Sequence, residues 1–234
     1  MILDNTLRLQ YLEAMGIDVW LPRASVHSEQ PLSSEIVTDN AEPETTASTS
    51  NNWDILQAEV ANCTKCTLCA TRTQTVFGSG NKQADWMLVG EAPGQHEDEQ
   101  GLPFVGNAGL LLTEMLRAIS LTREEVFITN ILKCRPPNNR DPHADEVESC
   151  NDYLQRQQKL IQPKIILAVG RIAAQTLLKT DEPLARLRGK VHTFNSTPVV
   201  VVYHPAYLLR SLSEKRKAWL DLTHAVQTVK DNEG

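Results

Sequence analysis

The sequence has no apolar run long enough to cross a membrane, and this absence excludes a membrane-spanning protein. A spanning helix needs about 20 mostly apolar residues, whereas the apolar stretches of this 234-residue chain are all much shorter. The first twenty residues alternate acidic, basic and apolar side chains and lack the apolar centre of a secretory signal peptide. We therefore expect a cytoplasmic protein.

Three widespread motifs are also missing. The chain contains no phosphate-binding loop, no G-x-G-x-x-G fingerprint of a dinucleotide-binding fold and no serine nucleophile elbow. Any chemistry must therefore rest on residues outside these familiar arrangements.

An excess of basic charge is absent as well. The chain has 23 basic and 29 acidic residues and a net charge of −6, which by itself argues against a nucleic-acid partner. The acidic excess is local, because residues 1–50 hold eight acids and two bases. Between Arg186 and Lys217, by contrast, lie seven bases and one acid. Such a stretch suits phosphate groups, although a solvated surface with counter-charges elsewhere explains it equally well.

The N-terminal part of the chain differs in composition from the rest. Apolar residues at helical spacing predict a short amphipathic helix within residues 1–23. Residues 24–52 are rich in Ser, Thr, Glu, Asn and Pro and have few large apolar side chains, which is typical of a disordered linker. We expect one folded domain, over residues 53–234.

After residue 53, short apolar runs alternate with segments of helical periodicity. Four of these runs predict buried strands, at residues 86–89, 126–129, 165–169 and 199–203. Helices are expected over residues 111–119 and from Asp141, with Pro142 in the first turn, to about Ile161. This alternation predicts a three-layer α/β/α domain around a short four-stranded parallel sheet. Ligands of such sheets bind at the carboxyl ends of the strands.

The chain has five cysteines, at Cys63, Cys66, Cys69, Cys134 and Cys150. An odd number in a chain expected to be cytoplasmic argues against a disulfide framework. Cys63 and Cys66 form a C-x2-C turn whose thiolates can reach one metal centre, while Cys134 and Cys150 follow the second predicted strand. Four thiolates suit a structural zinc ion or an iron–sulfur cluster. Free buried cysteines, packing as small apolar side chains, are the alternative.

Five short segments near the predicted strand ends carry groups suited to chemistry. They are residues 90–94 (Gly-Glu-Ala-Pro-Gly), 101–106 (Gly-Leu-Pro-Phe-Val-Gly), 129–130 (Thr-Asn), 133–137 (Lys-Cys-Arg-Pro-Pro) and 204–210 (His-Pro-Ala-Tyr-Leu-Leu-Arg). In this order, and with the C-x2-C turn upstream, the segments resemble the family 4 uracil-DNA glycosylases, the iron–sulfur branch of the uracil-DNA glycosylase superfamily. The resemblance covers roughly residues 60–212.

The resemblance implies a [4Fe–4S] cluster bound by Cys63, Cys66, Cys134 and Cys150, with Cys69 left outside the pattern as a free thiol. In this family the cluster is regarded as structural. It would tie the segment before the first strand to the loop and helix after the second.

The resemblance also implies roles for the residues at the strand ends. Phe104 matches the aromatic residue that stacks on a flipped base, Asn130 the amide that reads its edge, and His204 the imidazole that contacts its O2. Glu91 matches the carboxylate of the first motif. Many superfamily members have an Asp at the third position of that motif, where this chain has Ala92, so the part that Glu91 plays in catalysis is open.

These residue types suit the removal of uracil from DNA, in which the base must leave the stack. Stacking on Phe104 would return roughly 1–3 kcal/mol per base. Asn130 can donate to O4 and accept from N3–H of uracil, whereas cytosine opposes it at both points. His204 can donate to O2 a hydrogen bond that strengthens as charge develops on the departing base. The plain alternatives are a core phenylalanine, an amide in a local turn and a structural histidine.

We therefore expect a monomeric DNA glycosylase that hydrolyses the N-glycosidic bond of uracil in single- or double-stranded DNA and leaves an abasic site for base excision repair. Besides the residues just discussed, Gly90, Ala92 and Glu97 are expected to line the base pocket, and Arg188, Lys190 and Arg210 to hold DNA phosphates. The second hypothesis is an iron–sulfur DNA-binding protein of the same fold with little or no glycosylase activity, acting as a redox-sensitive module.

Overall fold

The computed structural model describes residues 44–233. The amphipathic helix predicted within residues 1–23 and most of the predicted linker lie outside the described residues. Residues 44–52 of that linker belong instead to helix α2 (Glu44–Ala61), so the linker prediction was wrong for them. The buried side chains of Trp53, Leu56 and Val60 hold this helix against the core, and the polar residues before them continue it.

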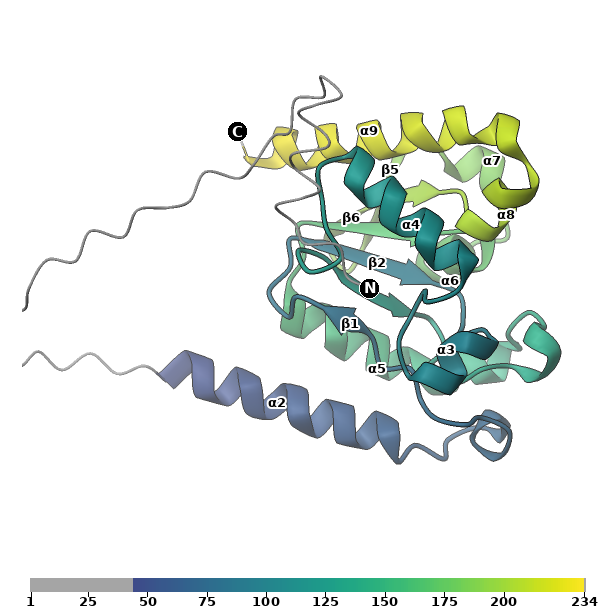
Figure 1. Cartoon of the computed structure of the whole chain (residues 1–234). Helices are drawn as coiled ribbons and strands as arrows, with labels where there is room; N and C mark the ends of the chain where they lie inside the picture. The colour runs from purple at the N-terminus through teal and green to yellow at the C-terminus, as the bar shows by residue number, and fades with distance from the viewer. Residues whose placement is uncertain (1–43, 234) are drawn as a thin grey trace, which may run out of the picture. The chain divides into compact units, whose positions relative to one another are not determined.

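A six-stranded mixed sheet lies at the centre, in the order β1-β3-β2-β4-β6-β5 (Figure 1). The strands are β1 (Ser79–Gly80), β2 (Trp86–Gly90), β3 (Phe127–Asn130), β4 (Ile165–Val169), β5 (Val191–Phe194) and β6 (Thr197–Val202). The four predicted strands correspond to β2, β3, β4 and β6, and these pair in parallel. The parallel core of the prediction is therefore confirmed, and two short antiparallel edge strands, β1 and β5, are added to it.

The added strand β5 forms a hairpin with β6. The two residues between them, Asn195 and Ser196, have φ angles of 45° and 70°. Positive φ at both central positions is the geometry of the tight turn that matches the twist of paired strands, and Asn adopts it more readily than most residues.

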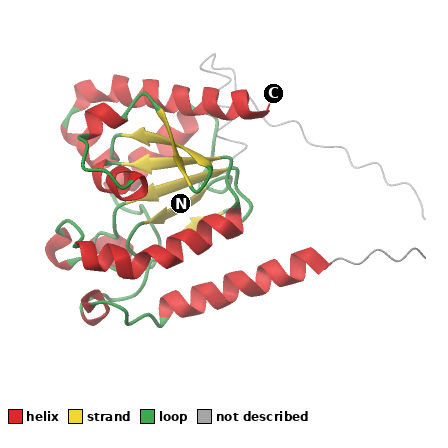
Figure 2. Ribbon diagram, turned by 180° about the vertical axis from the view of Figure 1, so that it is seen from behind, coloured by secondary structure: helices red, strands yellow, loops and turns green. Residues whose placement is uncertain are grey.

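Helices cover both faces of the sheet and give the predicted three-layer architecture (Figures 1 and 2). One face carries α4 (Asn107–Ala118), α8 (Pro205–Arg210) and α9 (Lys215–Glu233), and the other carries α2, α5 (Ala144–Ile161), α6 (Arg171–Leu178) and α7 (Leu184–Leu187). The helix predicted from Asp141 begins instead at Ala144, with His143 at its N-cap. None of the described helices is long and apolar enough to span a membrane.

Each face of the sheet has its own apolar core. In β2, Met87 and Val89 pack toward α2, α5 and α6, whereas Leu88 packs toward α4, α8 and α9. Because the central strands are buried on both faces, they are continuously apolar in sequence.

The strand order reverses at β2, which pairs with β3 on one side and β4 on the other. In open α/β sheets, ligands bind outside the carboxyl ends of the strands at such a reversal. The short helices α3 (Gln95–Gln100) and α8 follow β2 and β6, respectively, in the chain.

Candidate functional site

A cavity of about 640 Å³ lies at the carboxyl ends of β2, β4 and β6. Each of these strands contributes the residues that directly follow it. The lining consists of Glu91, Ala92, Asn139, Asp141, Gly170, Arg171, Ile172, Leu184, Tyr203, His204, Ala206, Tyr207 and Arg210. Three predicted pocket residues, Glu91, Ala92 and His204, are among them.

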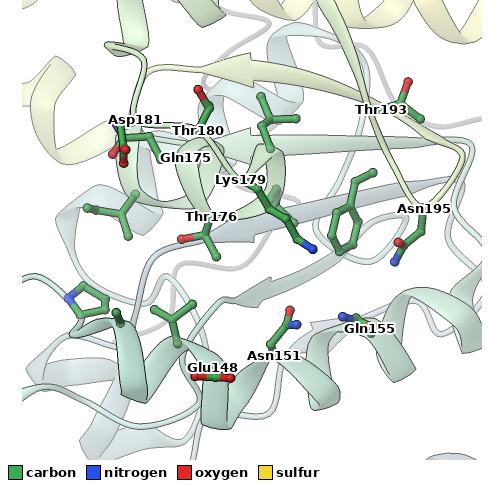
Figure 3. Close-up of a pocket in the computed structure, with 17 residues that line it drawn as sticks. Glu148, Asn151, Gln155, Gln175, Thr176, Lys179, Thr180, Asp181, Thr193 and Asn195 are labelled. Atoms are coloured by element: carbon green, nitrogen blue, oxygen red, sulfur yellow. The ribbon is translucent and has the colours of Figure 1, made fainter.

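A second hollow, of about 730 Å³, lies between α5, α6 and the β5–β6 hairpin. Figure 3 shows Asn151 and Gln155 on α5 at one side of it and Thr176 and Lys179 at the other. Its lining includes none of the predicted site residues, so the chemistry expected from the sequence belongs to the first cavity.

His204 is fixed by the start of helix α8. It is the N-cap residue, and Pro205 occupies the first helical position, where a missing N–H has no cost. The Nδ1 atom accepts a hydrogen bond from the backbone N–H of Ala206 at 3.1 Å, so the proton of the neutral ring is on Nε2. Burial, reinforced by the Arg210 cation, lowers the pKa of His204 to about 4. The imidazole is therefore a neutral hydrogen-bond donor near pH 7.

Phe104 has a left-handed backbone conformation, with φ of 53°, which costs of order 1–3 kcal/mol for a residue other than glycine. Arg123 holds this conformation by donating to the carbonyl oxygens of Pro103 and Phe104 at 2.8 and 3.2 Å. Gly109 is required beside it, because a Cβ there would lie 1.7 Å from the Phe104 carbonyl oxygen. The ring centroid of Phe104 lies 5.7 Å from that of His204. The strained loop thus places an aromatic ring next to the imidazole.

Glu97 holds the same loop from the other side. Its Oε1 atom accepts the N–H groups of Val105 and Gly106 at 3.0 and 3.2 Å, and Oε2 accepts the N–H of Gly94 at 3.1 Å. Like Gly90, Phe104 and Asn130, the residue is not part of the cavity lining. Three backbone donors use its carboxylate, which ties two loops together.

Asn130 ends β3 with 2 % of its surface exposed, and its side chain meets that of Phe104 over Gly90. A Cβ on Gly90 would lie 2.3 Å from Oδ1 of Asn130 and 2.7 Å from Cζ of Phe104. Any side chain at position 90 would therefore displace the amide or the aromatic ring. The structure brings Gly90, Phe104, Asn130 and His204 together, although the sequence places them in four separate segments.

A fully buried lysine, which the sequence analysis did not identify, fixes the backbone of Asn130. The Nζ atom of Lys133 donates to the Asn130 carbonyl oxygen at 2.7 Å, to Thr129 Oγ1 at 2.6 Å and to Gln157 Oε1 at 2.7 Å. The amide of Gln157 donates in turn to the Phe77 carbonyl oxygen at 2.8 Å. The Lys-Cys-Arg-Pro-Pro segment was singled out, but a single lysine beside a cysteine carries no sequence pattern that marks it as buried.

Glu91 carries the perturbed carboxyl group of the cavity. Burial, together with the negative charge of Asp141, raises the pKa of Glu91 to about 7, and Arg171 acts in the opposite direction. Arg171 is ion-paired with Asp141 at 2.7 Å. Perturbed groups of this kind are typical of active sites. The neighbouring Ala92 contributes only a methyl group to the lining.

Four of the five cysteines, Cys63, Cys66, Cys134 and Cys150, gather at the apolar core on the α2 and α5 side of the sheet. Cys134 and Cys150 are buried, and Cys63 and Cys66 are partly buried. Cys69 is outside this apolar cluster, but it is close enough for its charge to influence the pKa of Cys66.

Hydrogen-bond donors point at the two buried sulfur atoms. The guanidinium of Arg72 donates to Sγ of Cys134 at 3.1 Å, and the backbone N–H of Lys133 donates to Sγ of Cys150 at 3.4 Å. Burial raises the pKa of Cys134 to about 11, although Arg72 opposes the shift. The thiolate form therefore needs a further positive partner.

The three residues predicted to bind DNA phosphates differ in their exposure and in their partners. Arg210 is exposed and lines the cavity, and Lys190 is exposed beside β5. Arg188 has partners within the protein, because its Nε donates to Oδ2 of the buried Asp221 at 2.6 Å and its guanidinium lies 4.1 Å from the ring centroid of Tyr203. Its charge is therefore largely balanced inside the protein, unlike those of Arg210 and Lys190.

Comparison with known proteins gives consistent matches over the region that contains the cavity. The family model described as the uracil DNA glycosylase superfamily matches residues 77–223. The type-4 uracil-DNA glycosylase of Archaeoglobus fulgidus is 49% identical over 164 residues, which cover 67% of this chain and 82% of the relative. The type-4 enzyme of Saccharolobus solfataricus is 46% identical over 168 residues, covering 68% and 78%. That of Thermotoga maritima is 40% identical over 164 residues, covering 69% and 85%.

Proposed function

The chain belongs to the uracil DNA glycosylase superfamily, with type-4 relatives matched over most of their length, and we propose that it excises uracil from DNA as the first step of base excision repair. The observation that carries this proposal is the convergence of Gly90, Phe104, Asn130 and a neutral His204 at the carboxyl ends of the sheet. The reaction is the hydrolysis of the bond between N1 of uracil and C1′ of the sugar.

Recognition of the base rests on Asn130 and Phe104. A flipped uracil must recover the free energy lost on leaving the stack, and the ring of Phe104 supplies a stacking surface. The carboxamide of Asn130 complements O4 and N3–H of uracil and opposes the corresponding groups of cytosine. Lys133 holds the strand end from which this amide projects, so the discriminating group is set before the base arrives.

Departure of the base is assisted by His204. As the bond to C1′ breaks, negative charge develops on uracil, and the Nε2–H of a neutral imidazole can donate to O2. This hydrogen bond strengthens in the transition state and so lowers the barrier. Because the Ala206 N–H holds Nδ1, the donor is oriented in advance.

The attacking water requires a hydrogen-bond acceptor more than a strong base, because the sugar is already cationic when water attacks. Glu91 supplies a carboxyl group to the cavity lining, directly after the end of β2. Its pKa of about 7 allows the ionised form to orient water at C1′ at neutral and higher pH. Ala92 leaves the neighbouring position without a second acceptor.

We also propose that Cys63, Cys66, Cys134 and Cys150 bind a [4Fe–4S] cluster. The hydrogen bonds to the sulfurs of Cys134 and Cys150 are of the type that stabilises cluster thiolates. Among the described residues, no three His, Cys, Asp or Glu side chains are placed to bind one metal ion. A four-iron cluster has no such requirement, because each thiolate binds a different iron. The cluster would supply cross-linking between chain segments and take no part in the reaction.

The experiment is excision from a single-stranded oligonucleotide that contains one uracil. After incubation with the full-length protein, alkali should cleave the strand at the uracil position and leave matched thymine and cytosine oligonucleotides intact. Asn130→Asp, which places a negative charge against O4, should reduce the rate by orders of magnitude while the fold is retained. Binding of the uracil oligonucleotide without cleavage would instead support the non-catalytic DNA-binding hypothesis.

A further inference from the structure

The outer part of the cavity has no role in the chemistry just described. A volume of about 640 Å³ lies in the range of sites for ligands considerably larger than one pyrimidine ring. Besides Glu91, Ala92 and His204, the wall includes the aromatic rings of Tyr203 and Tyr207 and the apolar side chains of Ile172 and Leu184, next to polar and charged residues. Two aromatic rings and two branched apolar side chains form a surface suited to a second flat ring.

The two tyrosines are ordered before any ligand binds. Their rings stack with centroids 5.1 Å apart and 29° between the planes. Arg188 packs on the ring of Tyr203, and Asp221 together with the carbonyl oxygen of Lys217, 2.8 Å away, holds its guanidinium. Tyr207 nevertheless keeps 38% of its surface exposed. A ring that is already held loses little conformational entropy on stacking.

This aromatic pair lies next to the catalytic residue. The backbone N–H of Tyr207 donates to the carbonyl oxygen of His204 at 2.9 Å, so the platform begins within one helical turn of the group that supports the departing base. Arg210 follows at the end of the same helix, exposed and on the cavity wall. An aromatic surface on which a base can stack and a cation that can bind phosphate therefore lie together beside the reaction site.

We propose that Tyr207, supported by Tyr203, stacks on the base that neighbours the uracil in the same strand, while Arg210 binds a phosphate beside that nucleotide. The inference rests on the proposed function and adds a second base subsite to it. Stacking on an aromatic ring depends weakly on base identity, so the subsite detects that a base is present. A neighbour that is paired and stacked in a duplex must be released first, so single-stranded DNA is the favoured substrate.

The test replaces the neighbouring nucleotide of the uracil by a tetrahydrofuran abasic analogue, on the 5′ side in one single-stranded oligonucleotide and on the 3′ side in another. Wild-type protein should lose roughly 5- to 150-fold in kcat/KM with one of the two, as expected for the loss of one stacked base, and mainly through KM. Tyr207→Leu should abolish the dependence on the neighbouring base, and Tyr207→Phe should keep it. Trp219→Leu, at an exposed aromatic residue outside the cavity, is the matched control and should keep it as well.

The same oligonucleotides are also measured by fluorescence anisotropy, which reports binding whether or not uracil is cleaved. Excision that proceeds equally well on both abasic-flanked strands would overturn the subsite and leave the glycosylase function standing. A dependence of kcat/KM on the neighbouring base that persists in Tyr207→Leu would also overturn the subsite. Without any excision the proposed function fails, and the anisotropy comparison then decides on the subsite alone.

Discussion

The rate of uracil excision should follow the ionisation of Glu91. Burial raises the pKa of this carboxyl group to about 7, whereas the pKa of His204 is lowered to about 4. If the carboxylate orients the attacking water, kcat/KM rises with pH around a midpoint near 7. The ionised fraction grows from about 10% at pH 6 to about 90% at pH 8, which predicts a roughly tenfold increase. His204 stays neutral above about pH 5, so its ionisation adds no second pH-dependent step to the rate profile.

The two charged residues that act on Glu91, Asp141 and Arg171, predict in which direction the midpoint of the pH profile should shift when each is replaced. Asp141→Asn removes the negative charge that raises the pKa of Glu91 and leaves Arg171 without its ion-pair partner. Both effects favour the carboxylate, so the midpoint should move to lower pH, by about half a unit to one unit for a partly exposed site. Arg171→Gln should move it to higher pH. Opposite shifts from two members of one ion pair are not expected from a general loss of structure.

The assay is single-turnover excision from a uracil oligonucleotide between pH 5.5 and 9 at constant ionic strength. Glu91→Gln should give a slower and pH-independent rate. Asp181→Asn, at an exposed carboxylate outside this cavity, is the charge-matched control and should leave the midpoint in place. A wild-type profile that is flat through pH 7, or a midpoint that ignores Asp141→Asn, would refute the role given to Glu91.

The same shift has a consequence for stability. Between about pH 4.5 and pH 7 the folded protein keeps a proton on Glu91 that the unfolded chain has lost, so the free energy of unfolding falls as pH rises through this window. At pH 8, Glu91→Gln should therefore be more stable than the wild type by about 1–2 kcal/mol, allowing for the solvent that still reaches the group. At pH 4 the two should unfold alike, and a denaturant titration at both values checks this.

Three further predictions follow from the other contacts of the site. His204→Ala should lose about 10²-fold or more in single-turnover rate, as for removal of one oxyanion-hole donor, and a larger loss for Glu91→Gln would reverse the assigned roles. Purified protein should be brown with about four irons and four acid-labile sulfides per chain. Cys134→Ser should lose colour and solubility, Cys69→Ser should lose neither, and colourless protein with stoichiometric zinc would contradict the cluster. Lys133→Met, which removes one donor from each of three buried acceptors, should lower the free energy of unfolding by about 2–4 kcal/mol in urea titrations; an unchanged value would show that the hydrogen bonds of this buried side chain contribute nothing.

The central strands of the fold were predictable because burial on both faces makes them continuously apolar. The edge strands were not, since β1 has two residues and β5 exposes Val191 and Thr193. Helix α2 extends nine residues further toward the N-terminus than its composition suggested. A buried apolar stripe after residue 52 anchors this helix, and a linker composition upstream did not prevent the helix from continuing.

The residues proposed to face the base could be named from the sequence because they stand in short motifs that resemble those of a known family. The residues that hold those motifs could not be named. Glu97 binds backbone N–H groups of a loop eight and nine positions away, and Lys133 binds Gln157 on another element. Such roles depend on which segments meet in three dimensions, and residue type alone gives no sign of them.

The cationic stretch between Arg186 and Lys217 shows that the sequence alone does not reveal which charges are used inside the protein and which are available to a ligand. Two of its seven bases are used within the protein, Arg188 by Asp221 and Lys217 by Glu214 at 2.8 Å. The other five are exposed, and among the described residues no carboxylate forms an ion pair with them; they are Arg186, Lys190, Arg210, Lys215 and Arg216. A phosphate backbone interacts with the local field and not with the net charge. An overall charge of −6, all of it accounted for by residues 1–50, is therefore compatible with a domain that binds DNA at the rim of this cavity.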